Sequence, residues 1–337
     1  MRRYLCLILL SGIFFSCHKS NNGPSTGPSG NGTDTTGTRP GDTSAAKGAW
    51  KFMGSIPSHP AINDIFFTSL SKGFAAVSDG YLYQTSDSGW TWTKIPNSFS
   101  GSNGMSNLFF VNSTYGFAQS PTQLQVTTDG GNTWSLRYLS SNMAFNIFFT
   151  SPSTGYYGDI NTGVYKTTDT GKTWTKTFQS TKSGVDYPMY FLNPDKGFIF
   201  CGDATFSKTN NGGDNWQQIQ QNIFVTGSAP IGYNTLQFLD TLTGYYASKR
   251  GLLKTTDGGT TWNSAYSTGN GINVVKFISP TKGYFLTGVN IFKSTNSGQA
   301  WNLDAYAGGG EFVGMSFIDS TGWACTSTGN VLRTYHP

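Results

Sequence analysis

Carboxylates are the groups through which this sequence could do acid–base chemistry, and aspartate supplies nearly all of them. Of the 17 acidic residues, only Glu311 is a glutamate. Hydrolysis of a glycosidic bond needs two carboxyl groups roughly 5–10 Å apart, flanking that bond. Because an aspartate in a turn usually serves the turn itself, we predict no catalytic residue. A two-aspartate hydrolase stays as the alternative, and its candidates are Asp64, Asp159, Asp186, Asp203 and Asp304.

Other catalytic and binding chemistries lack their residue patterns. The three histidines are too scattered for a metal site, and no serine elbow, histidine-based triad or phosphate-binding loop is present. The net charge of +5 is spread thinly, with no basic cluster beyond Lys249 and Arg250. Such a distribution is not typical of nucleic-acid binding. We therefore predict no metal, no cofactor and no nucleic-acid partner.

The N-terminus has the pattern of an export signal. Arg2 and Arg3 precede an apolar stretch over residues 5–15, which is too short to cross a bilayer comfortably. Cys17 follows in a segment that resembles a bacterial lipobox, which implies lipidation of this cysteine; an ordinary cleaved signal is the alternative. We predict a signal peptide over residues 1–16 and a lipid-anchored Gly/Ser/Thr/Pro linker over 17–48. The predicted location is the outer membrane, facing the periplasm or the cell surface.

Beyond residue 48, an apolar run followed by a turn and a Gly-aromatic pair recurs seven times. The glycines are 43, 39, 42, 47, 39 and 39 residues apart. A period near 40 residues is the size of one four-stranded propeller blade. The seven pairs are Gly73-Phe74, Gly116-Phe117, Gly155-Tyr156, Gly197-Phe198, Gly244-Tyr245, Gly283-Tyr284 and Gly322-Trp323.

A second motif, Thr-x-Asp-x-Gly-x-Thr-Trp, recurs six times at the same period. Its Asp or Asn side chain can accept turn amides, its glycine can take a positive φ, and its tryptophan can enter the apolar layer. Asn211 and Asn296 replace the aspartate in two copies, so we interpret these positions as structural rather than catalytic. The Asp/Asn and Trp pairs are Asp87 and Trp92, Asp129 and Trp134, Asp169 and Trp174, Asn211 and Trp216, Asp257 and Trp262, and Asn296 and Trp301.

The seventh unit stops after three strand patterns and has no such motif. The missing fourth strand is found at the other end of the repeat region, where Trp50-Lys51-Phe52 corresponds to Trp92-Thr93-Lys94. Residues 49–337 are therefore predicted to form an all-β, seven-bladed β-propeller of four-stranded antiparallel blades. The N-terminal strand completes the last blade, which removes an exposed sheet edge.

Both motifs resemble those of the Asp-box propellers, whose motif is also called the bacterial neuraminidase repeat. Within them, the chain is similar to the seven-bladed photosystem II assembly-factor-like group, from about Trp50 to Thr334. The resemblance implies that the Asp-boxes lie on the side of the ring opposite the usual ligand face. It also implies help in assembling a membrane or envelope complex, although nothing in the sequence suggests photosynthesis. The arginine triad of the related sialidases is not matched.

The connections that vary most in length carry aromatic and charged residues, which suit a protein interface or the apolar faces of sugars. We predict a non-catalytic cell-envelope scaffold that binds an envelope protein or complex through this face. The alternative is a carbohydrate-active protein that binds or cleaves a glycan. Such aromatics can equally seal the gaps between blades. The candidate binding residues are Tyr138, Phe145, Tyr187, Tyr233, Arg250, Tyr266, Tyr306 and Glu311.

A further polar set lies near the starts of the innermost strands of the predicted ring. These residues are expected at the mouth of the central channel, where ordered water is the ordinary occupant. They are Asn63, Asp64, Asn107, Asn146, Asn234 and Asn273.

Overall fold

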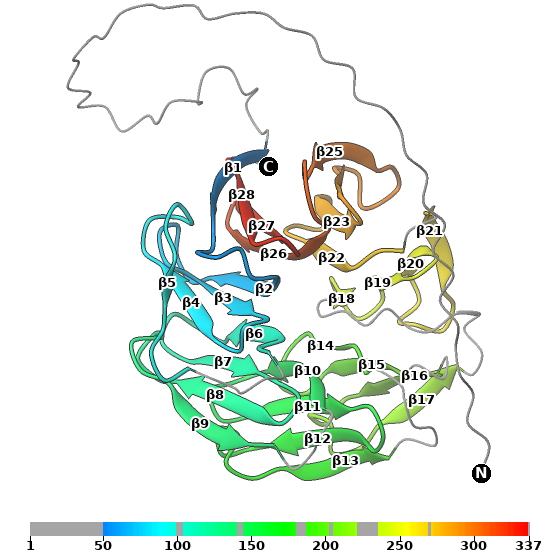
Figure 1. Ribbon diagram of the computed structural model, residues 1–337. Coiled ribbons are helices and arrows are strands. Elements are labelled where there is room, and N and C mark those ends of the chain that lie inside the picture. The colour runs from blue at the N-terminus through cyan, green and yellow to red at the C-terminus, as the bar shows by residue number, and fades with distance from the viewer. Residues whose placement is uncertain are drawn as a thin grey trace, which may run out of the picture. The chain divides into compact units, whose positions relative to one another are not determined.

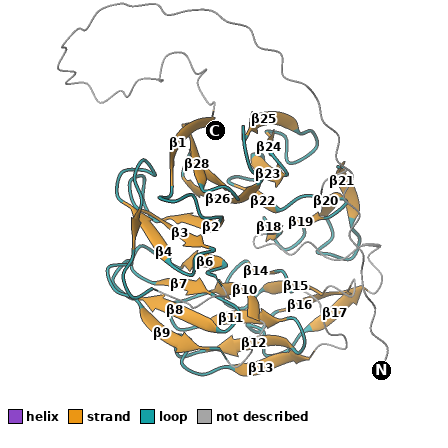
Figure 2. Ribbon diagram, in the orientation of Figure 1, coloured by secondary structure: helices purple, strands orange, loops and turns teal. Residues whose placement is uncertain are grey.

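The computed structural model describes residues 50–98, 104–139, 144–179, 187–201, 205–220, 235–268 and 271–335. All of them belong to one compact unit, residues 45–337. The described segments contain strands, turns and loops, and none of them forms a helix that could cross a membrane (Figure 2). The predicted signal peptide, Cys17 and the predicted linker lie outside the described residues.

The strands form seven four-stranded antiparallel sheets arranged as the blades of a propeller, which confirms the predicted fold (Figure 1). In blade 1 the strands predicted from the sequence over residues 65–68, 74–78, 81–85 and 91–95 agree with the observed ones to within three residues at either end. Blades 1 to 3 are β2 (Ile62–Phe67), β3 (Gly73–Val77), β4 (Leu82–Thr85) and β5 (Thr93–Lys94); β6 (Asn107–Phe110), β7 (Gly116–Gln119), β8 (Gln123–Thr127) and β9 (Ser135–Tyr138); and β10 (Ala144–Phe149), β11 (Gly155–Asp159), β12 (Gly163–Thr167) and β13 (Thr175–Gln179).

The remaining blades repeat this order, and in each the first strand lies innermost. Blades 4 to 6 are β14 (Met189–Phe191), β15 (Gly197–Cys201), β16 (Thr205–Thr209) and β17 (Gln217–Gln220); β18 (Leu236–Phe238), β19 (Gly244–Ser248), β20 (Gly251–Thr255) and β21 (Asn263–Ser267); and β22 (Val274–Phe277), β23 (Gly283–Thr287), β24 (Asn290–Ser294) and β25 (Asn302–Tyr306). Blade 7 is β26 (Phe312–Ile318), β27 (Thr321–Thr326), β28 (Asn330–Tyr335) and β1 (Trp50–Ser55).

The ring is closed by pairing the first described strand with the last. β1 runs antiparallel to β28, with Trp50 opposite Thr334 and Phe52 opposite Leu332 (Figure 1). The N-terminal strand therefore supplies the outermost strand of blade 7, as predicted from its likeness to residues 92–94. Blade 7 is thus a complete four-stranded sheet.

The Gly-aromatic motif holds each blade against the next through two contacts. The phenylalanine that ends the innermost strand covers the glycine of its own blade: a Cβ on Gly73 would lie 2.7 Å from the Phe67 ring, closer than packed atoms allow. The other face of Phe67 stacks on Trp323 of blade 7, at a centroid distance of 3.8 Å. The corresponding stacked pairs at the other six interfaces are Phe74–Phe110, Phe117–Phe149, Tyr156–Phe191, Phe198–Phe238, Tyr245–Phe277 and Tyr284–Phe317.

The Asp-boxes connect the third and fourth strands of blades 1 to 6, and their side chains are occupied by the turn. In blade 2, Asp129 accepts hydrogen bonds from the Thr127 hydroxyl and from both the amide and the hydroxyl of Thr133. The backbone and side-chain hydrogen bonds from Thr133 lower the pKa of Asp129 to about 2. Asn211 accepts bonds from Thr209 and the Asn215 amide in the same way, so the turn does not require a charge.

Candidate functional site

One face of the ring, called here the loop face, is built from two kinds of connection. These are the turns between the second and third strands of a blade and the connections from the fourth strand to the next blade. Backbone hydrogen bonds fasten the two together: the Phe312 amide donates to Gly288, and the Ser327 amide donates to Glu311. The Asp-boxes follow the third strand, so the antiparallel order of the blades places them on the opposite face.

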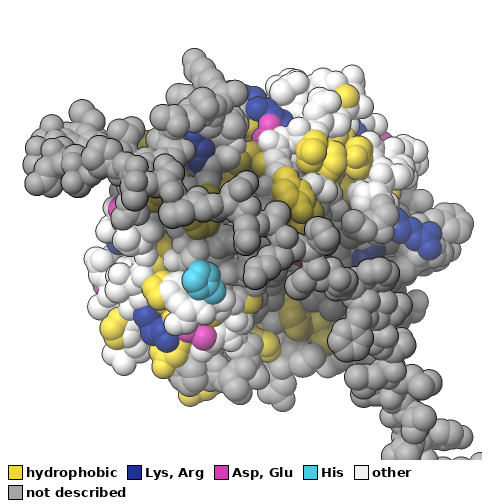
Figure 3. All heavy atoms as spheres, turned by 45° about the horizontal axis from the view of Figure 1, so that its top comes forward, with side chains coloured by type: hydrophobic (Ala, Val, Ile, Leu, Met, Phe, Trp, Pro, Cys, Tyr) yellow, Lys and Arg dark blue, Asp and Glu magenta, His cyan; other side chains and the backbone are white. Residues whose placement is uncertain are grey.

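Four of the predicted binding residues are exposed where the chain enters or crosses the loop face. Tyr138 ends β9 and is 70% exposed, and Tyr306 ends β25 and is 64% exposed. Arg250 lies in the β19–β20 turn, and Glu311 precedes β26; both are exposed. Tyr138 and Tyr306 are on the outermost strands of blades 2 and 6, so they mark separate positions on the rim rather than one patch. On the side of the molecule drawn in Figure 3, the visible hydrophobic side chains of described residues form separate groups among polar ones.

Two other predicted binding residues, Tyr187 and Tyr266, pack against a neighbouring blade, and for Tyr187 this corrects its assignment to an accessible surface. Tyr187 is only 1% exposed, because it lies edge-on to Phe178 at 6.3 Å and covers Gly158. Tyr266 is half-buried against Phe285 and Phe292, at centroid distances of 5.1 and 5.4 Å. Phe145 is half-buried in β10. Tyr233 lies outside the described residues.

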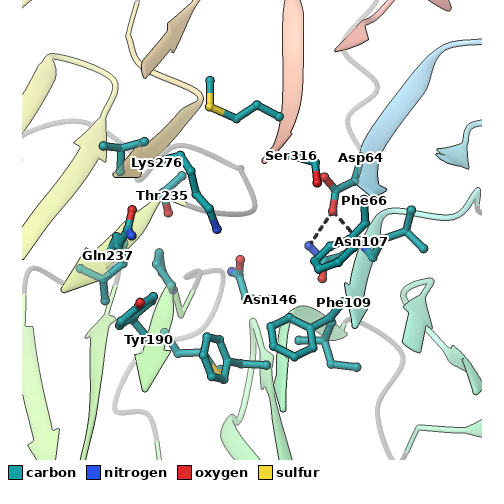
Figure 4. Close-up of a pocket in the computed structure, with 18 of the residues that line it drawn as sticks. Asp64, Phe66, Asn107, Phe109, Asn146, Tyr190, Thr235, Gln237, Lys276 and Ser316 are labelled. Carbon is teal, nitrogen blue, oxygen red and sulfur yellow. Dashed lines mark hydrogen bonds between the residues drawn. The ribbon is translucent and has the colours of Figure 1, made fainter. Parts of the chain in front are cut away.

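The second candidate site is a cavity of about 130 Å³ in the central channel. It is lined by the innermost strands of all seven blades, β2, β6, β10, β14, β18, β22 and β26 (Figure 4). Asp64, Asn107 and Asn146 of the predicted channel-mouth set do line it. Asn63 and Asn273 instead donate to the carbonyls of Met105 and Phe312, and Asn234 is outside the described residues.

The cavity wall differs between the two halves of the ring. At equivalent positions of the innermost strands, blades 1 to 4 present Phe66, Phe109, Phe148 and Tyr190. Their ring centroids follow one another at 6.5, 5.0 and 5.7 Å, which makes a continuous aromatic wall. Blades 5 to 7 present the polar residues Gln237, Lys276 and Ser316 at the same positions. The channel is therefore aromatic on one side and polar on the other.

Two of the three polar residues are used to join neighbouring blades. Gln237 accepts a bond of 2.7 Å from the Phe277 amide and donates one of 3.0 Å to the carbonyl of the same residue. The Ser316 hydroxyl accepts a bond of 2.9 Å from the Phe67 amide. No described residue forms a hydrogen bond or ion pair with the Lys276 ammonium, and Figure 4 shows this side chain reaching into the cavity.

Asp64 lies across the cavity from Lys276 and also joins blade 1 to blade 2 by hydrogen bonding. It is 2% exposed and accepts hydrogen bonds of 2.9 Å from the amides of Ile65 and of Leu108 in blade 2. Burial raises the pKa of Asp64 to about 7, against the opposing effect of those amides and of Lys276. Burial also lowers the pKa of Lys276, with Asp64 opposing that shift.

Lys276, Gln237 and Ser316 were not predicted as channel residues. A signal was present: each stands one residue before the stacking phenylalanine, at the position where blades 1 to 4 have an aromatic residue. An alignment of the seven apolar runs by that phenylalanine would have shown three polar interruptions in consecutive blades.

The aspartates considered for hydrolysis are not brought together. Asp159 accepts bonds from Asn161 and Thr162 within its own turn. Asp304, on the outermost strand β25, accepts a bond from the Trp50 indole, while Asp64 is on innermost strand β2. Asp186 and Asp203 lie outside the described residues. Over the described ranges, Asp64 is the one carboxylate on the cavity wall, and no group of three metal-ligating side chains is found.

Comparisons with known proteins agree with this architecture. Residues 43–186 match the model of the family described as Photosynthesis system II assembly factor YCF48. A structure described as YCF48 bound to D1 peptide is 18% identical, with 87% of this chain and 99% of that chain covered and a TM-score of 0.69. No curated protein sequence matches the chain.

Enzymes share the same fold at similarly low identity, up to 18% for a GH74 enzyme from Niastella koreensis. Virginiamycin B lyase from Staphylococcus aureus is 10% identical, with 84% of this chain and 98% of that chain covered and a TM-score of 0.69. The GH74 xyloglucanase from Xanthomonas campestris is 12% identical, with 85% of this chain but only 53% of that chain covered and a TM-score of 0.64. Likeness at such identities shows the fold alone. Taken together, the two repeat motifs, the ring closure and the match over residues 43–186 make the chain a seven-bladed β-propeller that is similar to the photosystem II assembly-factor group.

Proposed function

We propose that this protein is a non-catalytic scaffold of the cell envelope that binds a protein partner through the loop face. The observation that carries the proposal is the family match over residues 43–186, together with a fold relative described as bound to a peptide. The described cavity wall supports it as well, because a glycosidase needs a second carboxylate and Asp64 stands alone there.

The loop face offers suitable contacts for such a partner. Tyr138 and Tyr306 present large amphipathic rings, and Arg250 and Glu311 present charges of both signs. Tyrosine and arginine are enriched at protein interfaces, where a few residues carry most of the binding energy. The lipid on Cys17 and the linker over residues 17–48, both predicted from the sequence, would hold the ring near the outer membrane.

The experiment is a crosslinked pull-down of the tagged full-length protein from its own envelope. The test variant carries Tyr138→Ala and Tyr306→Ala, which remove exposed rings without disturbing a blade interface. The matched control carries Leu70→Ala and Leu242→Ala, which are 49% and 56% exposed in first-to-second-strand turns on the opposite face. We expect a discrete protein partner that the control retains and the test variant loses.

The alternative, a carbohydrate-active protein, predicts a different result in the same experiment. In that case no protein is crosslinked, and the full-length protein is retained on envelope or plant polysaccharide. Substitution of aspartates by asparagine would then identify a hydrolase if it abolished cleavage and left the fold intact. Equal capture of the partner by the test and control variants would contradict the loop-face assignment.

A further inference from the structure

The central cavity has the size and lining of a small-molecule site, separate from the loop-face contacts proposed above. Its volume of about 130 Å³ is close to that of a cavity of about 150 Å³ that binds benzene in another protein. Ligand pockets are mostly apolar, with a few polar groups that fix orientation. The aromatic wall of blades 1 to 4 and the single uncommitted ammonium of Lys276 satisfy that description.

The charge of Lys276 determines which ligands fit. Gln237 and Ser316 are occupied by the backbone of the next blade, so among the three polar residues of blades 5 to 7 only Lys276 has no hydrogen-bond partner in the described part of the chain. A buried or half-buried cation without a partner is unfavourable, and an anion at hydrogen-bond distance relieves that penalty. Asp64 accepts hydrogen bonds from the amides of Ile65 and Leu108, and no ion pair between Asp64 and Lys276 is found among the described residues. Its pKa of about 7 also leaves much of the carboxyl group uncharged near neutral pH.

The aromatic wall opposite Lys276 determines which apolar part of a ligand fits the cavity. Phe109 and Phe148 are half-buried with their centroids 5.0 Å apart, and their unburied surface faces the cavity. Phe66 and Tyr190 extend this surface on either side. An apolar ring placed here removes aromatic surface from water, and edge-to-face or offset ring–ring contacts add to the attraction.

We propose that the central channel binds a small organic monoanion with a single-ring apolar body, whose carboxylate pairs with Lys276 and whose ring packs on Phe109 and Phe148. The cavity volume admits one ring and excludes a folded segment. Asn107 adds a buried side-chain oxygen for which no partner is found among the described residues, and which can accept a bond from bound water or from a ligand hydroxyl.

The test uses benzoate as the probe on the purified full-length protein, with calorimetry and thermal melting as readouts. Benzamide has the same shape without the charge, benzylamine carries the opposite charge, and acetate has the carboxylate without the ring. We expect benzoate to bind in the millimolar range and to raise the melting temperature. The other three compounds are expected to bind at least about tenfold more weakly.

Variants locate the site. Lys276→Met keeps the length and apolar stem of the side chain and is expected to reduce benzoate affinity to that of benzamide. Lys249→Met, at an exposed lysine of the β19–β20 turn, is the matched control and is expected to bind as wild type. Phe109→Leu is expected to weaken benzoate and benzamide alike.

Several results would overturn the proposal. One is the absence of benzoate binding at tens of millimolar, in which case the channel holds water only. Others are equal affinities for benzoate and acetate, or unchanged benzoate binding in a folded Lys276→Met protein. The four-compound comparison on wild type needs no variant, so a misfolded variant does not remove the test. None of these outcomes depends on the protein partner of the loop face.

Discussion

The indole N–H of Trp50 donates a hydrogen bond of 2.8 Å to a carboxylate oxygen of Asp304, 254 positions further along the chain. The Trp50 ring also lies edge-on to Phe317 at 6.4 Å and 81°, nearly the geometry of Trp92 on Phe67 at 6.2 Å and 82°. Trp50 therefore takes the place of the Asp-box tryptophan that blade 7 lacks. It joins β1 to blade 6 by its side chain, in addition to the backbone pairing of β1 with β28.

Deleting residues 50–53 is expected to open blade 7 and to lower the melting temperature markedly, because it removes both the outermost strand and the tryptophan. Trp50→Phe keeps an aromatic ring but not the donor to Asp304, and we expect a loss of about 1–2 kcal/mol. Differential scanning calorimetry measures the loss of stability in both variants. Removal of residues 30–33 from the predicted linker is the control and is expected to have no effect. If the 50–53 deletion melts like wild type, the closure is wrong.

Gly73→Ala is expected to destabilise the protein by about 1–3 kcal/mol, because the new Cβ would lie 2.7 Å from the Phe67 ring. Chemical denaturation of this variant, of Phe67→Leu and of the double variant measures the coupling between the two positions. We expect the double variant to lose less than the sum of the two single losses. Gly309→Ala is the matched control, because nothing lies within 4 Å of its added Cβ. Strictly additive losses would show that the ring does not require the glycine.

The box aspartates are expected to stabilise the fold through the hydrogen bonds that their carboxylate oxygens accept. Asp129→Asn keeps one acceptor oxygen, as Asn211 does in blade 4, so a smaller loss of stability is expected than for Asp129→Ala. The pKa of Asp129 is lowered to about 2 in the folded protein. Its contribution is therefore present above the ordinary aspartate pKa and is lost as the pH falls through about 2. Between pH 5 and pH 2, the melting temperature should fall more steeply with decreasing pH for wild type than for Asp129→Asn. An equal pH dependence in the two proteins would contradict the lowered pKa of Asp129.

Asp64 is expected to give stability the opposite pH dependence to Asp129. Its folded pKa of about 7 lies above the ordinary value, so the folded state binds the proton more tightly and stability decreases as the pH rises from about 4 through 7. Asp64→Asn removes this titration but also one of the acceptors for the Leu108 and Ile65 amides. We expect the difference in melting temperature between wild type and Asp64→Asn to shrink from pH 5 to pH 8. A constant difference would show that Asp64 is ionised throughout this range. Among the described groups, Lys276 and Cys325 also interact electrostatically with Asp64.

The sequence by itself determined the blades, their number and the closing strand. This was possible because the Gly-aromatic and Asp-box motifs are local devices whose contacts recur at a fixed period, so seven copies of one pattern identify one architecture. The same locality explains why Asn211 and Asn296 could be recognised as substitutes for aspartate: their bonds are to residues within four positions.

Only the tertiary structure decided which aromatics are accessible and which residues meet in the channel. Tyr187 and Tyr138 both stand beside variable connections, yet one is buried against Phe178 and the other is exposed, because that depends on a neighbouring strand. Likewise, Asp64 of blade 1 and Lys276 of blade 6 line the same cavity only because the ring closes. Burial and long-range electrostatics are properties of the assembled blades, and no repeat taken singly contains them.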